Sequence, residues 1–491
     1  MTQIPNPQRS NLQAATSFAR KNSLRVAIVS VVVAIPCFWQ PHVGFGDFPS
    51  HVYNAWLYPK VPAGELQGLA TSGQHTNILS DVLLTWLIQH TGVDPAQRIV
   101  LSLAALLMFW GVFALIGSLR RKTEWWITPM IAMLSYGWAF QLGFLNSFIA
   151  AALGIWLFAL LWQGSRWDWL AAVPIAVLIY VASPWPLAWG AGIITFALLW
   201  SRTPKSRQWI WLPIGAVTLA AISFFLVSRW SGEWVRNDLL TISGADQFFI
   251  FRTRFYWLAV AIAALWTVIF VQQLRKPVPD SSAGSLPFHL YVLNAVAVVL
   301  LPFSIIPPGY TERFSFISPR LSLMAAAFAC VCFAIDKPAR WMRAAVWLLA
   351  LLFFCFLYSD MRQLNKVEAR VDELLRTIPP GQRVTALIYY PRARLRELHH
   401  MLDRECIGRC WSYGDYEPNS GQFRIRAIAP NPYVMWDTKD TAQLAQGQYI
   451  ARKEDLPLYQ IYPCGPRETD LCIRALQEGE RTGAIDKLRH W

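Results

Sequence analysis

Long apolar stretches separated by short polar connections run through the first three quarters of the 491-residue chain. Wound as an α-helix, most of them are about long enough to cross the hydrocarbon core of a bilayer. The pattern predicts about eleven membrane-spanning helices, near residues 23–40, 98–118, 124–141, 144–162, 167–182, 184–200, 208–227, 255–273, 286–304, 319–335 and 341–358. We therefore expect a polytopic α-helical membrane protein.

One further apolar stretch, residues 79–91, is too short to cross comfortably and carries Asp81 and Gln89. If it does not cross, every second loop between spans is basic, including residues 120–122, and all these loops lie on the cytoplasmic side, where basic loops are typical. If it does cross, residues 120–122 and most later basic clusters lie outside the cell membrane. We therefore expect a cytoplasmic N-terminus, an extracytoplasmic C-terminus and a large first outer loop at 41–97.

The outer loop is expected to contain two helices lying along the membrane surface, at about residues 49–60 and 78–91. Pro49 suits the first turn of such a helix, which puts Asp47 or Phe48 at its N-terminal boundary.

After residue 358 the pattern changes to a mixture of helices and strands. It predicts helices at 361–376 and 394–404, a turn at 379–381, and strands at 383–390, 433–436, 448–451 and 458–462. We therefore expect three parts: a cytoplasmic tail (1–22), a membrane module (23–358) and a small extracytoplasmic α/β domain (359–491). Segment 411–426 is polar and aromatic; contact with sugar is possible, but a structural loop near a disulfide is the favoured interpretation.

Composition supports the membrane assignment. The chain is 55% hydrophobic, only 15% charged and contains 25 tryptophans, which excludes an ordinary soluble domain and fits aromatic belts at the membrane interface. The net charge of +14 comes mostly from basic residues that flank apolar spans, so anionic lipid headgroups are the expected partner and nucleic acid is not.

The eight cysteines fall into two groups. Four lie within apolar spans and are expected to pack as small hydrophobic residues. The other four lie in the polar C-terminal part: Cys406, Cys410, Cys464 and Cys472. Their spacings fit a zinc ribbon poorly, and the expected compartment is oxidising, so we predict disulfides rather than a zinc site.

Asp47 is an isolated acidic residue just outside the membrane. Ser50, His51, Asn54 and Tyr58 follow it at spacings of three and four, so a helix starting near Pro49 would place them on one polar face. A carboxylate beside a histidine can take a proton from a hydroxyl group, which makes Asp47 and His51 catalytic candidates. The equally weighted alternative is that Asp47 only caps the helix and His51 is an interfacial polar residue.

Outer arginines form the second unusual feature, because they oppose the positive-inside bias. Arg320 stands at the outer mouth of a span, and Arg313 lies in the loop before it. A guanidinium binds phosphate through two parallel hydrogen bonds, so both are candidates for a lipid-linked phosphate; the alternative is snorkelling to lipid headgroups. Further substrate-binding candidates are Asn54, on the polar face after Asp47, and His75 and Asn146, in polar outer turns. The positions of His75 and Asn146 also suit a turn.

The segment Gly46–His51 and the turn Gly143–Asn146 resemble elements of the GT-C superfamily of polytopic membrane glycosyltransferases, in an uncharacterised bacterial branch. The resemblance implies a large first outer loop that opens with an acidic general base. It also implies a bacterial inner-membrane location. Many members have paired acids, whereas Asp47 is followed by Phe48. We therefore expect no cofactor and assign no metal ligands, although a divalent metal is possible.

The resemblance implies a reaction. A sugar on a polyprenyl phosphate would be transferred with inversion to a glycan, lipid or protein acceptor; Asp47 would act on the acceptor hydroxyl, and Arg320 or Arg313 on the leaving phosphate. Two alternatives remain: a transporter or flippase for lipid-linked glycans, and a non-catalytic envelope assembly protein.

Overall fold

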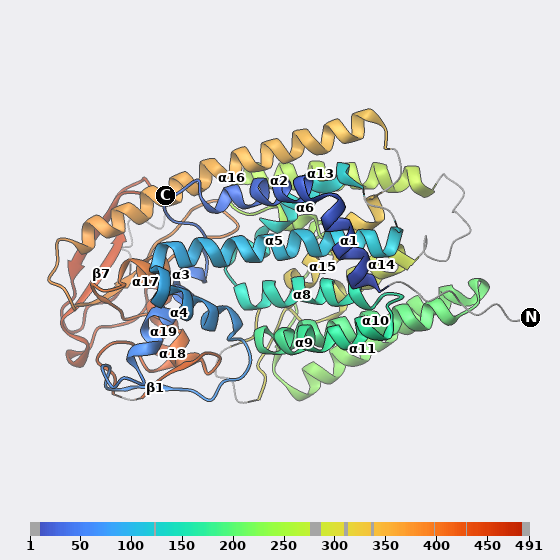
Figure 1. The fold of residues 1–491 in the computed structure, drawn as a ribbon. Helices are drawn as coiled ribbons and strands as arrows, with labels where there is room; N and C mark the ends of the chain where they lie inside the picture. Colours follow the sequence, from blue (N-terminus) through green and yellow to red (C-terminus); the bar gives the residue numbers. More distant parts are fainter. Residues whose placement is uncertain are drawn as a thin grey trace, which may run out of the picture.

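The computed structural model describes residues 10–121, 124–274, 286–308, 313–334, 338–396, 398–428 and 430–483. A long bundle of helices carries a smaller α/β part at one end, and helices α3 and α4 of the outer loop lie at that same end (Figure 1). The bundle contains α1 (Asn11–Lys21), α2 (Ser23–Ala34), α5 (Val93–Arg120), α6 (Thr128–Ser135), α7 (Trp138–Gln141), α8 (Leu145–Leu161), α9 (Arg166–Ala182), α10 (Pro184–Arg202), α11 (Trp211–Arg229), α12 (Leu239–Ser243), α13 (Thr253–Leu274), α14 (Leu286–Leu300), α15 (Ile317–Phe333) and α16 (Arg340–Leu375).

Among the described residues, four helices are long and apolar enough to cross a membrane: Val93–Arg120, Lys205–Arg229, Thr253–Gln272 and Arg340–Leu375. Shorter apolar helices fill most of the other predicted positions. The protein is thus a mostly helical, multi-pass membrane protein. The number of eleven spans stays a prediction.

One predicted span is divided. Residues 124–141 form a short 3-10 turn and two short helices, α6 and α7, rather than one helix. The break falls at Gly137, where a Cβ atom would lie only 2.8 Å from the backbone oxygen of Gln247. The close approach of the chain before α13 therefore needs a glycine at this point.

The outer loop forms the two predicted helices, α3 (Phe48–Leu57) and α4 (Leu79–Thr91). Helix α3 does not lie exposed on a membrane surface, because nine of its ten residues are buried. The C-terminal part covers it: α17 (Met401–Glu405) packs against α3. Strand β1 (Leu69–Thr71) of the same loop pairs antiparallel with β6 (Ile425–Ala427).

The C-terminal part contains a four-stranded sheet in the order β5-β4-β7-β8. β4 (Arg383–Ala386) runs parallel to β5 (Trp411–Ser412) and β7 (Leu458–Pro463), and β8 (Leu471–Ala475) runs antiparallel to β7. Two helices complete it, α18 (Glu417–Ser420) and α19 (Thr438–Ala445). A small pair outside this part joins β2 (Gly232–Glu233) to β3 (Ser304–Ile305).

Some predictions for the tail were wrong. The helix expected at 394–404 is reduced to α17, because the backbone N–H groups of Arg394 and Leu395 donate to carbonyls of the membrane module instead. The segments 433–436 and 448–451 are not strands. In the first, the Asn431 side chain accepts from two backbone N–H groups and makes a turn.

The predicted disulfides are present, as Cys406–Cys410 and Cys464–Cys472. The first closes the end of α17, and the second links β7 to β8. Of the four cysteines in the bundle, Cys355 is exposed on α16 and the others are buried.

A buried arginine, Arg404, joins the two parts of the molecule. Its Nε and Nη2 donate to the two carboxylate oxygens of Glu368 at 2.7 and 2.8 Å. Its Nη1 donates to Gln97 Oε1 at 2.8 Å and to the carbonyl of Val43 at 3.1 Å. The contact therefore holds α17, α16, α5 and the chain just before Asp47 together.

Glu368→Gln tests this junction, because it leaves a buried guanidinium without its counter-charge. We expect the free energy of unfolding to fall by about 3–5 kcal/mol. Thermal unfolding in nanodiscs measures the change. Glu373→Gln is the matched control, since Glu373 lies on the same helix and is 64% exposed. Equal midpoints for the two variants would contradict the role of Arg404.

Candidate active site

Two glycine turns place Asp47. Gly46 and Gly143 both have a positive φ, at 57° and 86°. A Cβ at Gly46 would overlap the carbonyl of Leu142, and a Cβ at Gly143 would overlap the backbone of Asp47 and Phe48. The N–H of Asp47 donates to the Leu142 carbonyl at 3.0 Å. The two segments that carry the sequence resemblance are therefore packed directly against each other.

Asp47 stands immediately before α3, but its side chain makes no capping hydrogen bond there. Instead, Tyr416 Oη donates to Asp47 Oδ2 at 3.2 Å, and His400 Nε2 lies 3.8 Å from Asp47 Oδ1. The carboxylate remains 21% exposed. The helix-cap interpretation of Asp47 therefore has no support in its side-chain contacts, and the carboxylate faces two groups of the C-terminal part.

His400 is itself held by a carboxylate. Its Nδ1 lies 2.7 Å from Asp403 Oδ2, and Ser412 Oγ donates to the other oxygen of Asp403. Burial alone would lower the pKa of His400, but the carboxylates of Asp403 and Asp47 raise it to about 9. At neutral pH an imidazolium therefore faces Asp47. Burial and the carboxylate of Asp47 also hold the pKa of Tyr416 well above its ordinary value, so its hydroxyl stays a donor.

Arg320 lies in the first turn of α15 and contacts the same turn, residues 142–144, that packs against Asp47. Its guanidinium is stacked between the rings of Phe144 and Phe314, each 4.4 Å away, and its Nη1 donates to Ser147 Oγ at 2.8 Å. Within the described residues, no carboxylate lies within ion-pair distance of Arg320, and its buried Nε has no hydrogen-bond partner.

Arg320 lines a small cavity whose walls are mostly apolar. The other lining residues are Trp138, Ala139, Leu142, Phe144, Ser147, Phe148, Ala151, Trp185 and Leu323. The site thus combines a partly exposed carboxylate with a cation that has hydrogen-bonding capacity left over. Such a pair suits a reaction in which a proton is taken and negative charge develops nearby.

A second polar cluster lies under α3. His51 Nδ1 is 3.0 Å from Asp81 Oδ1 and 3.2 Å from Glu417 Oε1. Ser50 Oγ lies 3.0 Å from Glu417 and from Asp415, and Asn54 donates to Asp415 at 2.8 Å. The predicted polar face of α3 is therefore real, and it faces acids from the C-terminal part and from α4.

The histidine and the acids in this cluster shift one another's pKa values. Burial alone would lower the pKa of His51, but Glu417 and Asp81 raise it to about 10. Burial raises the pKa of Glu417 well above its ordinary value and that of Asp415 to about 7. An imidazolium with partly protonated acids is the expected state at neutral pH. Asn146 extends the network, because its Nδ2 donates to Asp81 Oδ2 at 3.0 Å.

The structure brings some of the predicted residues together and separates others. Asp47 and Arg320 share one site, while His51, Asn54 and Asn146 belong to the neighbouring cluster. Two candidates lie elsewhere: Arg313 forms an ion pair with Glu233, and His75 is exposed in the loop before α4. Sequence reasoning missed five residues of the C-terminal part that complete the site, namely His400, Asp403, Asp415, Tyr416 and Glu417.

One signal for these residues was visible. Segment 411–426 is polar and aromatic and contains Asp415 and Glu417, but its sequence favours a structural loop near a disulfide. The loop does adjoin the Cys406–Cys410 disulfide, and it also delivers Tyr416 to Asp47. The pair His399-His400 gave no spacing signal at all.

A group with the separations of metal ligands lies near this site but apart from it. Among the described residues, His42, Glu368 and Glu405 have ligand atoms within 4.8 Å of one another. The described carboxylates around Asp47 have other partners. Asp47 contacts Tyr416 and His400, and the acids near α3 contact His51, Ser50 and Asn54.

The fold and the site are those of a multi-pass membrane protein with a polar centre at one end of its helix bundle. No protein-family profile matches the chain, and no curated protein matches it significantly. The solved structures that are similar to the chain include two of ArnT from Cupriavidus metallidurans. The one bound to undecaprenyl phosphate has a TM-score of 0.48 and 10% identity, over 91% of this chain and 93% of that chain. The apo state has a TM-score of 0.46 and 9% identity, over 92% and 93%.

With TM-scores below 0.5, the likeness does not identify a substrate or a reaction for this chain.

His51→Gln tests the buried cluster under α3. The pKa of His51 is raised in the folded protein, so its contribution to stability is complete below pH 6.5 and is lost as pH rises through about 10. We expect the variant to lose about 3 kcal/mol or more at neutral pH, because it removes one partner of a buried ion pair. Its unfolding midpoint should also vary less between pH 6.5 and 10.

Thermal unfolding in nanodiscs across that range measures both effects. His90→Gln is the matched control, because His90 is exposed on α4. A pH dependence unchanged in His51→Gln would contradict the assignment.

Proposed function

We propose that this protein is a GT-C-type glycosyltransferase that moves a sugar from a polyprenyl-phosphate donor to an acceptor hydroxyl. The observation that carries the proposal is the turn at residues 142–144: it packs against the backbone of Asp47, and its Phe144 ring lies against Arg320 and lines the apolar cavity beside that residue. A lipid-linked sugar phosphate needs both: a base for the incoming hydroxyl and a cation for the departing phosphate.

Asp47 is the proposed general base. Its carboxylate is partly exposed, is free of helix capping and is oriented by Tyr416. In an inverting transfer, the acceptor oxygen bonds to the anomeric carbon while the bond from that carbon to the phosphate oxygen breaks. The acceptor proton passes to Asp47, and the polyprenyl phosphate leaves as an anion.

Arg320 is the proposed phosphate-binding residue. Among the described residues no carboxylate forms an ion pair with this guanidinium, so it is available to bind an anionic ligand. The rings of Phe144 and Phe314 lie against it and fix its plane. The apolar walls of the cavity suit the lipid end of the donor. Arg313 and His75 are not placed in this site, so the role is proposed for Arg320 alone.

His400 is the proposed positioning residue for the base. Its Nδ1 is fixed by Asp403, so the protonated Nε2 points its hydrogen toward Asp47. The carboxylate of Asp47 thereby has contacts to both His400 and Tyr416, which restrict its rotation. His51 and Asn54 support α3 from the adjacent cluster rather than acting on the substrate.

The topology proposed from charge completes the hypothesis. With the N-terminus in the cytoplasm and residues 359–491 outside, the site would open on the extracytoplasmic face of a bacterial inner membrane. A polyprenyl-phosphate sugar would reach it from the outer leaflet. The sugar and the acceptor are left open.

The proposal is tested with the full chain in nanodiscs and a panel of undecaprenyl-phosphate-linked sugars. Asp47→Asn should lower release of undecaprenyl phosphate by roughly 100-fold or more, while binding of undecaprenyl phosphate itself is kept. Arg320→Gln should instead weaken that binding. Asp437→Asn is the matched control, because Asp437 caps α19 and asparagine caps equally well.

Transfer that survives in Asp47→Asn would overturn Asp47 as the base. Movement of the labelled lipid across the membrane without sugar transfer would instead support the transporter alternative.

The His400–Asp403 pair predicts the pH dependence of transfer. As pH rises through about 9, His400 loses its Nε2 proton, and its lone pair then repels Asp47, so the rate should fall. The other ionisable or ring groups that face His400 are Asp403, Asp415, His399 and Tyr416. Asp403→Asn should move the fall to lower pH, because the main charge that raises the pKa of His400 is gone.

His400→Gln should lower kcat by roughly 10- to 100-fold and remove the alkaline fall, since no group titrates in its place. KM for the donor should change little. A pH–rate profile that keeps its alkaline limb in His400→Gln would contradict this role while leaving Asp47 as the base.

A further inference from the structure

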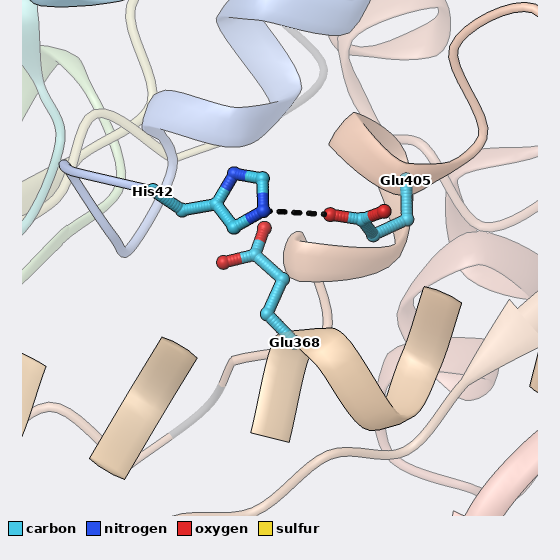
Figure 2. Close-up of side chains that lie close together, drawn as sticks. All are labelled: His42, Glu368 and Glu405. Carbon is cyan, nitrogen blue, oxygen red and sulfur yellow. Dashed lines mark ion pairs between the residues drawn. The ribbon is translucent and has the colours of Figure 1, made fainter. Parts of the chain in front are cut away.

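His42, Glu368 and Glu405 form a compact group of metal-ligand side chains outside the proposed active site. Figure 2 shows the imidazole and the two carboxylates pointing toward one another from three separate segments. His42 Nε2 lies 3.5 Å from Glu405 Oε1, and one ligand atom from each residue lies within 4.8 Å of the others. We propose that these three side chains bind a Zn²⁺ ion that fastens the segment leading to Asp47 onto the C-terminal part.

The backbone that carries His42 is fixed in advance. The N–H of His42 donates to Asn365 Oδ1 at 2.8 Å, and Asn365 Nδ2 donates to the carbonyl of His42 at 2.9 Å. Asn365 and Glu368 lie three residues apart on α16, hence on the same side of that helix. One turn of α16 therefore holds the backbone of the first ligand and supplies the second.

The two carboxylates are also held by their surroundings. Arg404 binds both oxygens of Glu368, which uses one lone pair on each and leaves the others available. Glu405 ends α17 and is followed directly by Cys406, whose disulfide to Cys410 closes that helix. Ligands on rigid elements, oriented by a further shell of contacts, are what a metal site requires.

The charges leave room for a cation. Arg404 is the one guanidinium in ion-pair contact with the group in the described chain, and it pairs with Glu368. Glu405 faces only His42 at ion-pair distance among those residues. Glu405 is 12% exposed and His42 26%, so an ion has access from solvent.

The donor set points to zinc. One imidazole nitrogen and two carboxylate oxygens, with water as the fourth ligand, fit tetrahedral Zn²⁺, whereas Mg²⁺ and Ca²⁺ prefer oxygen ligands alone. Val43 and Gly44 follow His42 and accept hydrogen bonds from Arg404. An ion here would therefore reinforce the segment that ends at Asp47, without touching the proposed reacting groups.

The test uses the purified full chain in nanodiscs, stripped with a chelator and then titrated with Zn²⁺ alone. We expect one zinc ion per chain by elemental analysis after desalting, and an unfolding midpoint that rises with zinc concentration. His42→Gln and Glu405→Gln should each weaken zinc binding by roughly 10-fold or more. Glu368 is left unchanged, because its loss would leave Arg404 buried without a partner.

Glu373→Gln is the matched control, since Glu373 lies on α16 outside the group and should leave zinc binding unchanged. Midpoints measured without metal show whether each variant is folded. Zinc binding that is absent in the parent chain, or equal in the parent and both ligand variants, would overturn the proposal. So would an equal rise of the midpoint with Mg²⁺ in place of Zn²⁺. None of these outcomes depends on sugar transfer.

Discussion

The buried guanidinium of Arg404 is the constraint on which the arrangement depends. A cation that is 3% exposed is tolerated only when it is hydrogen-bonded and a counter-charge is present. Arg404 on α17 meets this condition by joining Glu368 on α16, Gln97 on α5 and the backbone at Val43. The contacts thus join four segments of the chain, so the helix bundle and the C-terminal part must be assembled together.

The position of Asp47 follows from that assembly. The carbonyls of Val43 and Gly44 accept hydrogen bonds from Arg404. The chain then turns at Gly46, against Leu142, and continues into α3. Because the C-terminal part covers α3, the polar face of this helix meets acids where water would otherwise be. An acid that was isolated in the sequence thus becomes part of a connected set of charges.

Hydropathy predicted most of the helices because membrane helices need long apolar runs whatever their neighbours are. The mixed tail was predicted less well, since its segments are fixed by partners far away in the sequence. The backbone N–H groups of Arg394 and Leu395, for example, are held by carbonyls before α13. The site divides in the same way. Asp47 and Arg320 stood out because a charge near a membrane needs a reason, whereas His400 and Tyr416 lie in ordinary polar sequence. They reach Asp47 only through the fold.

Asp47 has no acidic neighbour in the sequence, and the structure shows where the other acids are. Asp81, Asp415 and Glu417 surround α3 but are engaged by His51, Ser50 and Asn54 on the helix face behind Asp47. Those buried acids hold α3 against α4 and the C-terminal part, whereas the carboxylate of Asp47 stays outside the cluster and contacts Tyr416 and His400. Assembly of the two parts therefore uses the acids around α3 and leaves the carboxylate of Asp47 partly open to solvent.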